Sequence, residues 1–233
     1  MMEFVFFDVG GTLLKDEMSR EQAFWHALDQ AGFAFEPAAV AAACREAHGA
    51  LGRAFLDRAI PEREAPRFWR HALYRALALE TDFDLVDALI DRPLSGLAWG
   101  MVDREAVAVL DSLRRRRCRM GVLSNWDQGL TRYLREKGLA DYFEVIVSSG
   151  EVGVSKPHPD LFRAALERCG TAAGATAHVG DSVLYDGEPA RAAGMLGVLL
   201  DRWGAEPDFA GPRIRRMSEL PPVLFGPQVA QEE

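Results

Sequence analysis

The stretch EFVFFDVGGTLL, residues 3–14, decides the fold of this 233-residue chain. Residues 3–7 form a short, almost continuously apolar run, which is typical of a parallel strand that is covered on both faces. The run ends at the carboxylate of Asp8, and two glycines, Gly10 and Gly11, follow it closely. The stretch therefore predicts a buried strand that presents Asp8 at its carboxyl end.

The second part of the chain alternates between helical and strand patterns. We expect helices over 103–117, 129–138, 160–170 and 187–195, and strands over 118–124, 143–149, 175–181 and 196–200. Units of this length predict a parallel, doubly wound α/β sheet with helices on both faces, joined by the strand at residues 3–7. Residues 213–224 predict one more short strand and a terminal helix.

Residues 16–99 have a different pattern, rich in Ala, Arg and Leu at helical spacing. They predict about four helices without strands, packed as a small bundle. Ser19 and Gln22 have the spacing of a capping box at the first helix, and Gly32 lies near its end. We therefore expect an α/β core of residues 1–15 and 100–233, interrupted by an inserted all-helical domain at 16–99.

The composition limits the classes of function. A net charge of -8 and a pI near 5.2 argue against non-specific binding of nucleic acid or anionic membranes. No apolar run approaches the length of a membrane helix, and the start of the chain does not resemble a secretory signal. The three cysteines have no CxxC spacing, which favours a reducing compartment. We expect a cytoplasmic monomer or homodimer that acts on a small molecule.

Polar residues gather where the predicted strands end. In open α/β sheets the binding crevice lies beyond the carboxyl ends of the strands. Each polar residue alone also fits a helix cap, a turn or a solvated loop, and only their coincidence at one sheet edge favours a site. Oxygen ligands without His or Cys favour Mg²⁺, and the hydroxyl, amide and lysine suit a tetrahedral dianion. The residues at this edge are Asp8, Ser124, Asn125, Lys156, Asp181 and Asp186.

Four short stretches carry a family resemblance. DVGGT at 8–12, LSN at 123–125, SKPHPD at 155–160 and GDSVLYD at 180–186 resemble, in order and spacing, the four motifs of the haloacid dehalogenase superfamily. The helical segment at 16–99 looks like the C1-type cap of subfamily I. The resemblance implies a Rossmann-like core with an inserted helical cap and a Mg²⁺-dependent hydrolase, most often a phosphatase of small phosphorylated metabolites.

The resemblance also implies a role for each matching residue. Asp8 is expected to be the nucleophile that forms an aspartyl-phosphate intermediate. Ser124 and Lys156 are expected to take part in catalysis by holding the transferring phosphoryl group. The implied phosphate-binding set is Ser124, Asn125, Lys156 and Thr12. The implied Mg²⁺ ligands are Asp8, the Gly10 carbonyl and Asp181, with Asp186 bound directly or one layer further out.

Gly10 is the main departure from the family pattern, because family phosphatases usually have a second Asp there as general acid and base. Loss of such a group typically costs about 10²–10⁴-fold in rate. The sequence leaves open a slow phosphatase, a phosphate-binding regulatory protein and, with less support, a metal-independent 2-haloacid dehalogenase. A phosphonoacetaldehyde hydrolase is disfavoured because the helical insertion contains no lysine. The candidates for a replacement proton donor are Asp127, His158, His26, Asp16 and Glu17.

Overall fold

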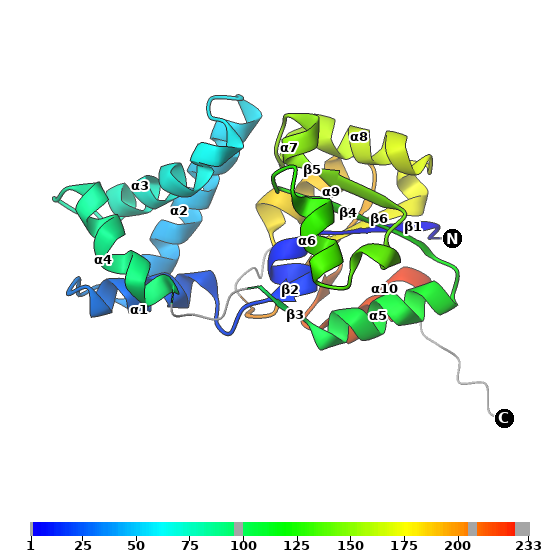
Figure 1. Cartoon of the computed structure of the whole chain (residues 1–233), viewed down its shortest axis with the longest axis horizontal. Coiled ribbons are helices and arrows are strands. Elements are labelled where there is room, and N and C mark those ends of the chain that lie inside the picture. Colours follow the sequence, from blue (N-terminus) through cyan, green and yellow to red (C-terminus); the bar gives the residue numbers. More distant parts are fainter. Residues whose placement is uncertain (1, 96–99, 205–208, 227–233) are drawn as a thin grey trace. The chain divides into compact units, whose positions relative to one another are not determined.

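The computed structural model describes residues 2–95, 100–204 and 209–226. Its contacts divide the chain into two compact units: residues 1–15 with 102–233, and residues 16–101. We call the first the core unit and the second the helical unit (Figure 1). The sequence places the boundary at Trp99, which lies outside the described residues, whereas Gly100 and Met101 group with the helical unit. Among the described residues, no helix is both long and apolar enough to cross a membrane.

The core unit is built on a six-stranded sheet in the order β5-β4-β1-β6-β7-β8. Every described pairing in it is parallel, as the alternating pattern predicts. The central strand β1 (Phe4–Phe7) is fully buried, because it lies between β4 and β6 and is covered on both faces. The remaining strands are β4 (Arg119–Ser124), β5 (Val145–Ser148), β6 (Thr176–Gly180), β7 (Leu196–Leu200) and β8 (Arg213–Ile214).

Helices cover both faces of this sheet. The side chains of Val5 and Phe7 point to the face covered by α5 (Arg104–Arg115), α6 (Leu130–Glu136) and α10 (Leu220–Phe225). Phe4 and Phe6 point to the other face, which α8 (Pro159–Cys169) and α9 (Glu188–Ala192) cover. The predicted doubly wound α/β fold is therefore confirmed, including the short strand and helix at the C-terminal end.

Short elements connect these strands and helices. The segment η1 (Val9–Leu13) follows β1 and contains two non-helical residues, Gly10 and Gly11. The segment η5 (Val183–Gly187) follows β6. The others are η3 (Ala140–Tyr142), α7 (Ser149–Val152), η4 (Ala173–Ala175) and η6 (Met217–Glu219).

The helical unit contains α1 (Arg20–Gln30), α2 (Pro37–Leu56), α3 (Ala65–Ala76), α4 (Phe83–Ser95) and the short η2 (Glu62–Glu64). The predicted capping box forms, since the Ser19 hydroxyl accepts from the Gln22 backbone N–H and the Gln22 side chain accepts from the Ser19 N–H. Trp69, Leu73 and Tyr74 are buried between the helices. The chain leaves and re-enters the core through β2 (Leu14–Lys15) and β3 (Met101–Val102), which pair in a two-stranded sheet.

Candidate active site

The parallel sheet brings the predicted polar residues to one edge. Asp8 follows β1, and the register aligns the end of β1 with Val122 in β4 and Val179 in β6. Ser124, at the end of β4, and Asp181, just after β6, therefore flank Asp8 on its two sides. Asp8, Asp181 and Asp186 each offer a carboxylate oxygen within 4.8 Å of the others, close enough for a shared metal ion. We call these three acids and Lys156 the core cluster.

Lys156 is the centre of the core cluster. Its Nζ donates to Asp8 Oδ1 at 2.7 Å, to Asp186 Oδ1 at 2.5 Å and to the Leu123 carbonyl at 3.3 Å. Lys156 and Asp186 are each 2% exposed and Asp8 is 7% exposed. One buried ammonium group is thus shared by two buried carboxylates, and removal of the lysine would leave both carboxylates without a compensating charge.

The electrostatics of the cluster follow from this burial. Burial raises the pKa of Asp8, and the neighbouring Asp186 adds to that rise while Lys156 opposes it. Burial alone would lower the pKa of Lys156, but Asp186 and Asp8 hold it well above its ordinary value. Burial likewise opposes ionisation of Asp186, yet Lys156 and His178 hold the pKa of that carboxyl well below its usual range. Lys156 is therefore a fixed cation and Asp186 a fixed anion at neutral pH.

Two glycines make room for the acids. Gly11 has a φ of +70°, and a Cβ there would lie 2.0 Å from Asp181 Oδ2. A Cβ on Gly180 would lie 2.1 Å from Asp186 Cγ. No side chain fits at either position while the acids keep their places, so each glycine is required by a close approach.

Gly10 differs from these two glycines. Its φ of −68° and ψ of 133° are accessible to any residue, and a Cβ there would meet no atom within 4 Å. The residue is exposed, beside the buried Asp8. Neither backbone strain nor crowding accounts for the missing carboxylate, so an Asp at this position should be accommodated without disturbing the loop.

The predicted phosphate-binding residues have different surroundings. Ser124 is 2% exposed at the strand edge. The Asn125 side chain holds the Lys156 backbone at both ends, because its Nδ2 donates to the Lys156 carbonyl at 3.0 Å and its Oδ1 accepts from the Lys156 N–H at 2.6 Å. The Thr12 hydroxyl is fully buried and has no hydrogen-bond partner among the described residues. The structure thus gives Asn125 a contact that positions the lysine.

Two residues near the core cluster make contacts that were not predicted from the sequence. His178, in β6, places Nε2 2.8 Å from Asp186 Oδ1. Arg202, after β7, donates to the carbonyls of Gly11 and Thr12 and to Asp103 at 3.3, 3.0 and 2.6 Å. The only sequence signal for His178 is a polar residue inside an apolar strand that runs directly into GD at 180–181.

Two candidate proton donors have local structural roles. Asp127 Oδ1 accepts from the Gly129 N–H at 2.6 Å, which is turn chemistry. His158 Nδ1 accepts from the Asp160 N–H at 3.2 Å and caps α8. Asp16, Glu17 and His26 belong to the helical unit, where Asp16 accepts from the Gly100 N–H at 2.8 Å. None of these contacts identifies a proton donor for the core cluster.

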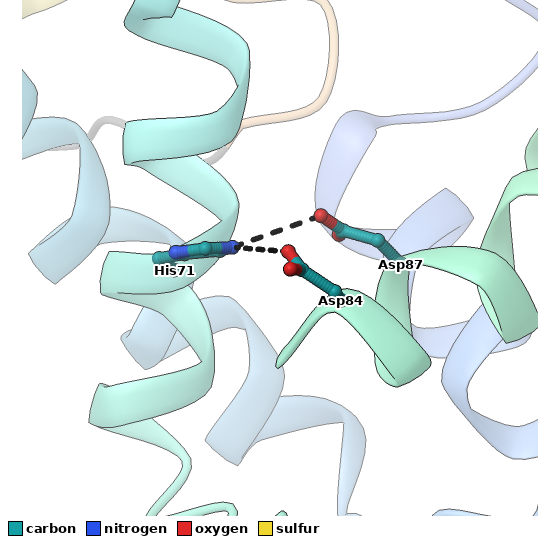
Figure 2. Close-up of side chains that lie close together, drawn as sticks. All are labelled: His71, Asp84 and Asp87. Carbon is teal, nitrogen blue, oxygen red and sulfur yellow. Dashed lines mark ion pairs between the residues drawn. The ribbon is translucent and has the colours of Figure 1, made fainter. Parts of the chain in front are cut away.

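A second group of possible metal ligands lies within the helical unit. Figure 2 shows His71 of α3 pointing toward Asp84 and Asp87 of α4, with Nε2 at 3.9 and 3.8 Å from their carboxylates. We call these three residues the helical-unit cluster. Both carboxylates already have arginine partners, since Arg67 contacts Asp84 at 2.9 Å and Arg70 contacts Asp87 at 3.3 Å.

Comparison with known proteins agrees with this geometry. Residues 2–194 match the hydrolase family described as haloacid dehalogenase-like hydrolase. Haloacid dehalogenase-like hydrolase domain-containing protein 3 of Danio rerio is 31% identical over 208 residues, 86% of this chain and 86% of that protein. Phosphoserine phosphatase of Thermus thermophilus is 43% identical over 108 residues, 45% of this chain and 42% of that enzyme.

A solved structure extends the likeness to almost the whole chain. The HAD-hydrolase YfnB of Bacillus subtilis, bound to magnesium, superposes with a TM-score of 0.65 at 23% identity, over 96% of this chain and 98% of that one. At this identity the likeness concerns the fold. It covers the α/β core together with the inserted helices.

Proposed function

The chain belongs to the haloacid dehalogenase-like hydrolase family, and on that premise we propose that it is a Mg²⁺-dependent phosphatase of a small phosphorylated metabolite. Relatives named as phosphatases support the choice of phosphate esters, among them the Thermus thermophilus phosphoserine phosphatase. The identity of the metabolite depends on groups outside the core cluster.

The observation that carries this proposal is the buried Lys156 ammonium shared by Asp8 and Asp186. In this arrangement Asp8 is held in one orientation at the open edge of the sheet, next to a fixed positive charge. A phosphoryl group that approaches Asp8 would meet that charge, which balances the negative oxygens of the transferring group. Ser124, buried at the adjacent strand end, is the second group assigned to those oxygens.

The proposed reaction proceeds in two steps at Asp8. A carboxylate oxygen of Asp8 attacks phosphorus, the bond from phosphorus to the ester oxygen breaks, and the leaving group departs with the electron pair and takes up a proton from solvent. Water then attacks the phosphorus of the aspartyl phosphate, releasing inorganic phosphate and restoring the Asp8 carboxylate. Lys156 is protonated before the attack, because Asp186 and Asp8 hold its pKa well above its ordinary value, and Asp186 remains beside it as a carboxylate in the intermediate.

The donor set fits a hard divalent cation. Asp8, Asp181 and Asp186 offer only oxygen atoms within 4.8 Å of one another, and Lys156 is the cation shared by two of them. These carboxylates, with the Gly10 carbonyl, are the groups that would hold Mg²⁺. When bound, Mg²⁺ supplies positive charge that neutralises phosphate oxygens and lessens the repulsion between Asp8 and its substrate.

The reaction is expected to favour good leaving groups. Gly10 carries no acid to protonate the departing oxygen, and Asp127 and His158 are engaged in local turn and cap contacts. The carboxylate of an acyl phosphate and the nitrophenolate of p-nitrophenyl phosphate leave readily without a proton donor, whereas the alkoxide of an alkyl phosphate does not. The proposal therefore predicts a strong dependence of rate on the leaving group.

Hydrolysis of p-nitrophenyl phosphate and acetyl phosphate, with and without Mg²⁺, tests the proposal. Asp8→Asn should lower turnover by at least about 10³-fold, because an amide is not a nucleophile at phosphorus. Asp141→Asn, which changes an exposed acid of the same unit, is the matched control and should leave the rate unchanged. Turnover that survives Asp8→Asn would reject the mechanism.

Gly10 also favours a second candidate, a regulatory protein that binds a phosphorylated ligand without useful turnover. The open space at position 10 makes Gly10→Asp a clean test. If the native protein is only a weakened enzyme, the added acid should raise turnover of alkyl phosphates by about 10²–10⁴-fold. A native protein that binds Mg²⁺ and phosphate without turnover, but gains it in Gly10→Asp, would support the regulatory candidate.

A 2-haloacid dehalogenase is the third candidate. The absent second acid is consistent with it, whereas three clustered carboxylates suit a metal that carbon–halogen cleavage by a carboxylate does not need. Release of halide from 2-chloropropionate in the presence of a chelator would favour this candidate over the phosphatase.

A further inference from the structure

His178 is a fully buried histidine in the interior of β6, and no step of the proposed reaction uses it. It packs edge-on against Phe162 of α8, with ring centroids 5.6 Å apart. Its Nδ1 is buried without a hydrogen-bond partner among the described residues. An apolar residue would avoid the free-energy cost of burying that unpaired nitrogen. The hydrogen bond that His178 does make is therefore the feature that accounts for a histidine at this position.

That bond joins His178 Nε2 to Asp186 Oδ1 at 2.8 Å. Since an ionised carboxylate can only accept, the hydrogen of this bond belongs to Nε2. Nδ1 is then left as a bare acceptor, which a buried site tolerates more readily than an unpaired N–H. The two ring nitrogens thus have a consistent assignment, with His178 as a donor to Asp186.

The sequence spacing explains how the two residues meet. Side chains alternate along a strand, so Thr176, His178 and the open position at Gly180 share one face of β6. Asp186, in η5, fills the space that a Cβ on Gly180 would occupy and from there reaches His178. His178, Gly180 and Asp186 therefore form one structural unit, in which Gly180 leaves the space that Asp186 fills beside His178.

Three donors fix the Asp186 carboxylate. Oδ1 accepts from Lys156 and from His178, and Oδ2 accepts from the Ser182 N–H at 3.1 Å. Lys156 is shared with Asp8. His178 is the donor that comes from the sheet interior, and its bond is to Asp186 rather than to the nucleophile.

We propose that His178 is a positioning residue, which orients Asp186 so that this carboxylate both holds the Lys156 ammonium beside Asp8 and keeps its place in the metal-binding group. The inference rests on the proposed function. Without His178, Asp186 would retain two donors and gain freedom to rotate about its Cβ–Cγ bond. Partners of this kind, one layer behind metal ligands, typically account for about 10–100-fold in metal affinity or activity.

The test compares four variants in the full-length protein. His178→Leu removes the donor and keeps an apolar side chain in the core. His178→Gln keeps an amide N–H that can reach Asp186, and His178→Asn has an amide too short to do so. Thr176→Val is the matched control, because it removes the hydrogen bond of a buried side chain on the same face of the same strand, and that bond is made to the Ala172 carbonyl rather than to Asp186. Each is measured for kcat and KM with acetyl phosphate and for Mg²⁺ affinity by calorimetry without substrate.

The four variants should differ in a specific pattern. His178→Leu and His178→Asn should lower kcat and weaken Mg²⁺ binding by about 10–100-fold, His178→Gln should recover most of both, and Thr176→Val should alter neither. The proposal would be overturned if His178→Leu kept the native kcat and Mg²⁺ affinity. It would also be overturned if His178→Gln had a kcat and Mg²⁺ affinity as low as those of His178→Asn.

The calorimetric measurement separates this inference from the proposed function. If the native protein binds Mg²⁺ but hydrolyses no phosphate ester, the phosphatase proposal fails, and the Mg²⁺ affinities of the variants still decide the role of His178. A native protein that neither binds Mg²⁺ nor turns over would overturn both. If His178→Leu does not fold, the comparison of Gln with Asn decides the role of His178 in its place.

Discussion

The core cluster and the helical-unit cluster offer metal ligands at similar spacing, yet their electrostatics differ. In each, three residues present ligand atoms within 4.8 Å of one another. In the core cluster two of the three carboxylates contact one lysine, and those two acids are almost completely buried. In the helical-unit cluster two carboxylates face a histidine (Figure 2). Each carboxylate also has an arginine partner, and the Asp84 side chain is 68% exposed.

The difference shows that ligand spacing alone does not define a cation site. The acids of the helical-unit cluster are already neutralised by guanidinium groups that link α3 to α4, and Asp87 also accepts from the Tyr74 hydroxyl at 2.5 Å. In the core cluster two carboxylates share one ammonium group where water has limited access, which is the condition that favours a divalent cation and a phosphoryl group. Three predictions test this contrast, and each changes one cluster or unit against the other.

The largest difference is expected when buried Asp8 and Asp186 lose Lys156 and, for comparison, Asp87 of the helical-unit cluster loses Arg70. Lys156→Met leaves Asp8 and Asp186 buried without their shared charge, so the free energy of unfolding should fall by about 3–5 kcal/mol. Arg70→Met, in a partly exposed ion pair, should cost about 0–1 kcal/mol. Urea unfolding at pH 7 without Mg²⁺ measures both. Equal losses of unfolding free energy in the two variants would contradict the proposed difference in burial and charge between the two clusters.

The second difference concerns metal binding. Asp181→Asn should weaken Mg²⁺ activation of acetyl phosphate hydrolysis by about 10²-fold, because it removes a carboxylate from the core cluster. Asp84→Asn should leave the Mg²⁺ dependence unchanged, since Arg67 already occupies that acid. A titration of rate against Mg²⁺ concentration measures both variants, and a shift with Asp84→Asn would instead indicate a functional cation in the helical unit.

The smallest difference concerns acid stability. In the helical unit, burial and the nearby Arg20 lower the pKa of His48 to about 3. The unfolded chain takes up a proton on this histidine below about pH 6.5 and the folded chain does not, so stability should fall as the pH falls below that value, by about 1.4 kcal/mol per pH unit. Asp186 in the core cluster stays ionised over this range, because its pKa is held well below the usual value. Urea midpoints at pH 7 and 5.5 should therefore differ in the native protein and much less in His48→Leu.

The placement of the site could be predicted from the sequence because parallel topology fixes the geometry. Once residues 3–7, 118–124 and 175–181 are assigned to parallel strands, Asp8, Ser124 and Asp181 must lie at the same edge. The structure confirms those strands and the helices between them. The capping box at Ser19 could also be predicted, because it depends only on two residues three positions apart, Ser19 and Gln22.

The contacts that cross between distant segments could not be predicted. From the sequence alone, Asn125 is a polar residue that follows a predicted strand. The structure shows that its side chain makes two hydrogen bonds to the Lys156 backbone. His178 sits in a strand whose neighbours are apolar, so its pairing with Asp186 depends on the path of η5. The sequence also does not show that position 10 is open while position 11 is crowded, because both are glycine.

The proposed role of Asp8 as a nucleophile can be tested by mass spectrometry of the peptide that contains it. The protein is mixed with acetyl phosphate and Mg²⁺ and quenched in acid. Because Gly10 carries no base to activate water, we expect a phosphoryl group on Asp8 that accumulates in the native protein, declines in Gly10→Asp and is absent in Asp8→Asn. Turnover of acetyl phosphate with no adduct on Asp8, or an adduct on this peptide that persists in Asp8→Asn, would contradict the proposed mechanism.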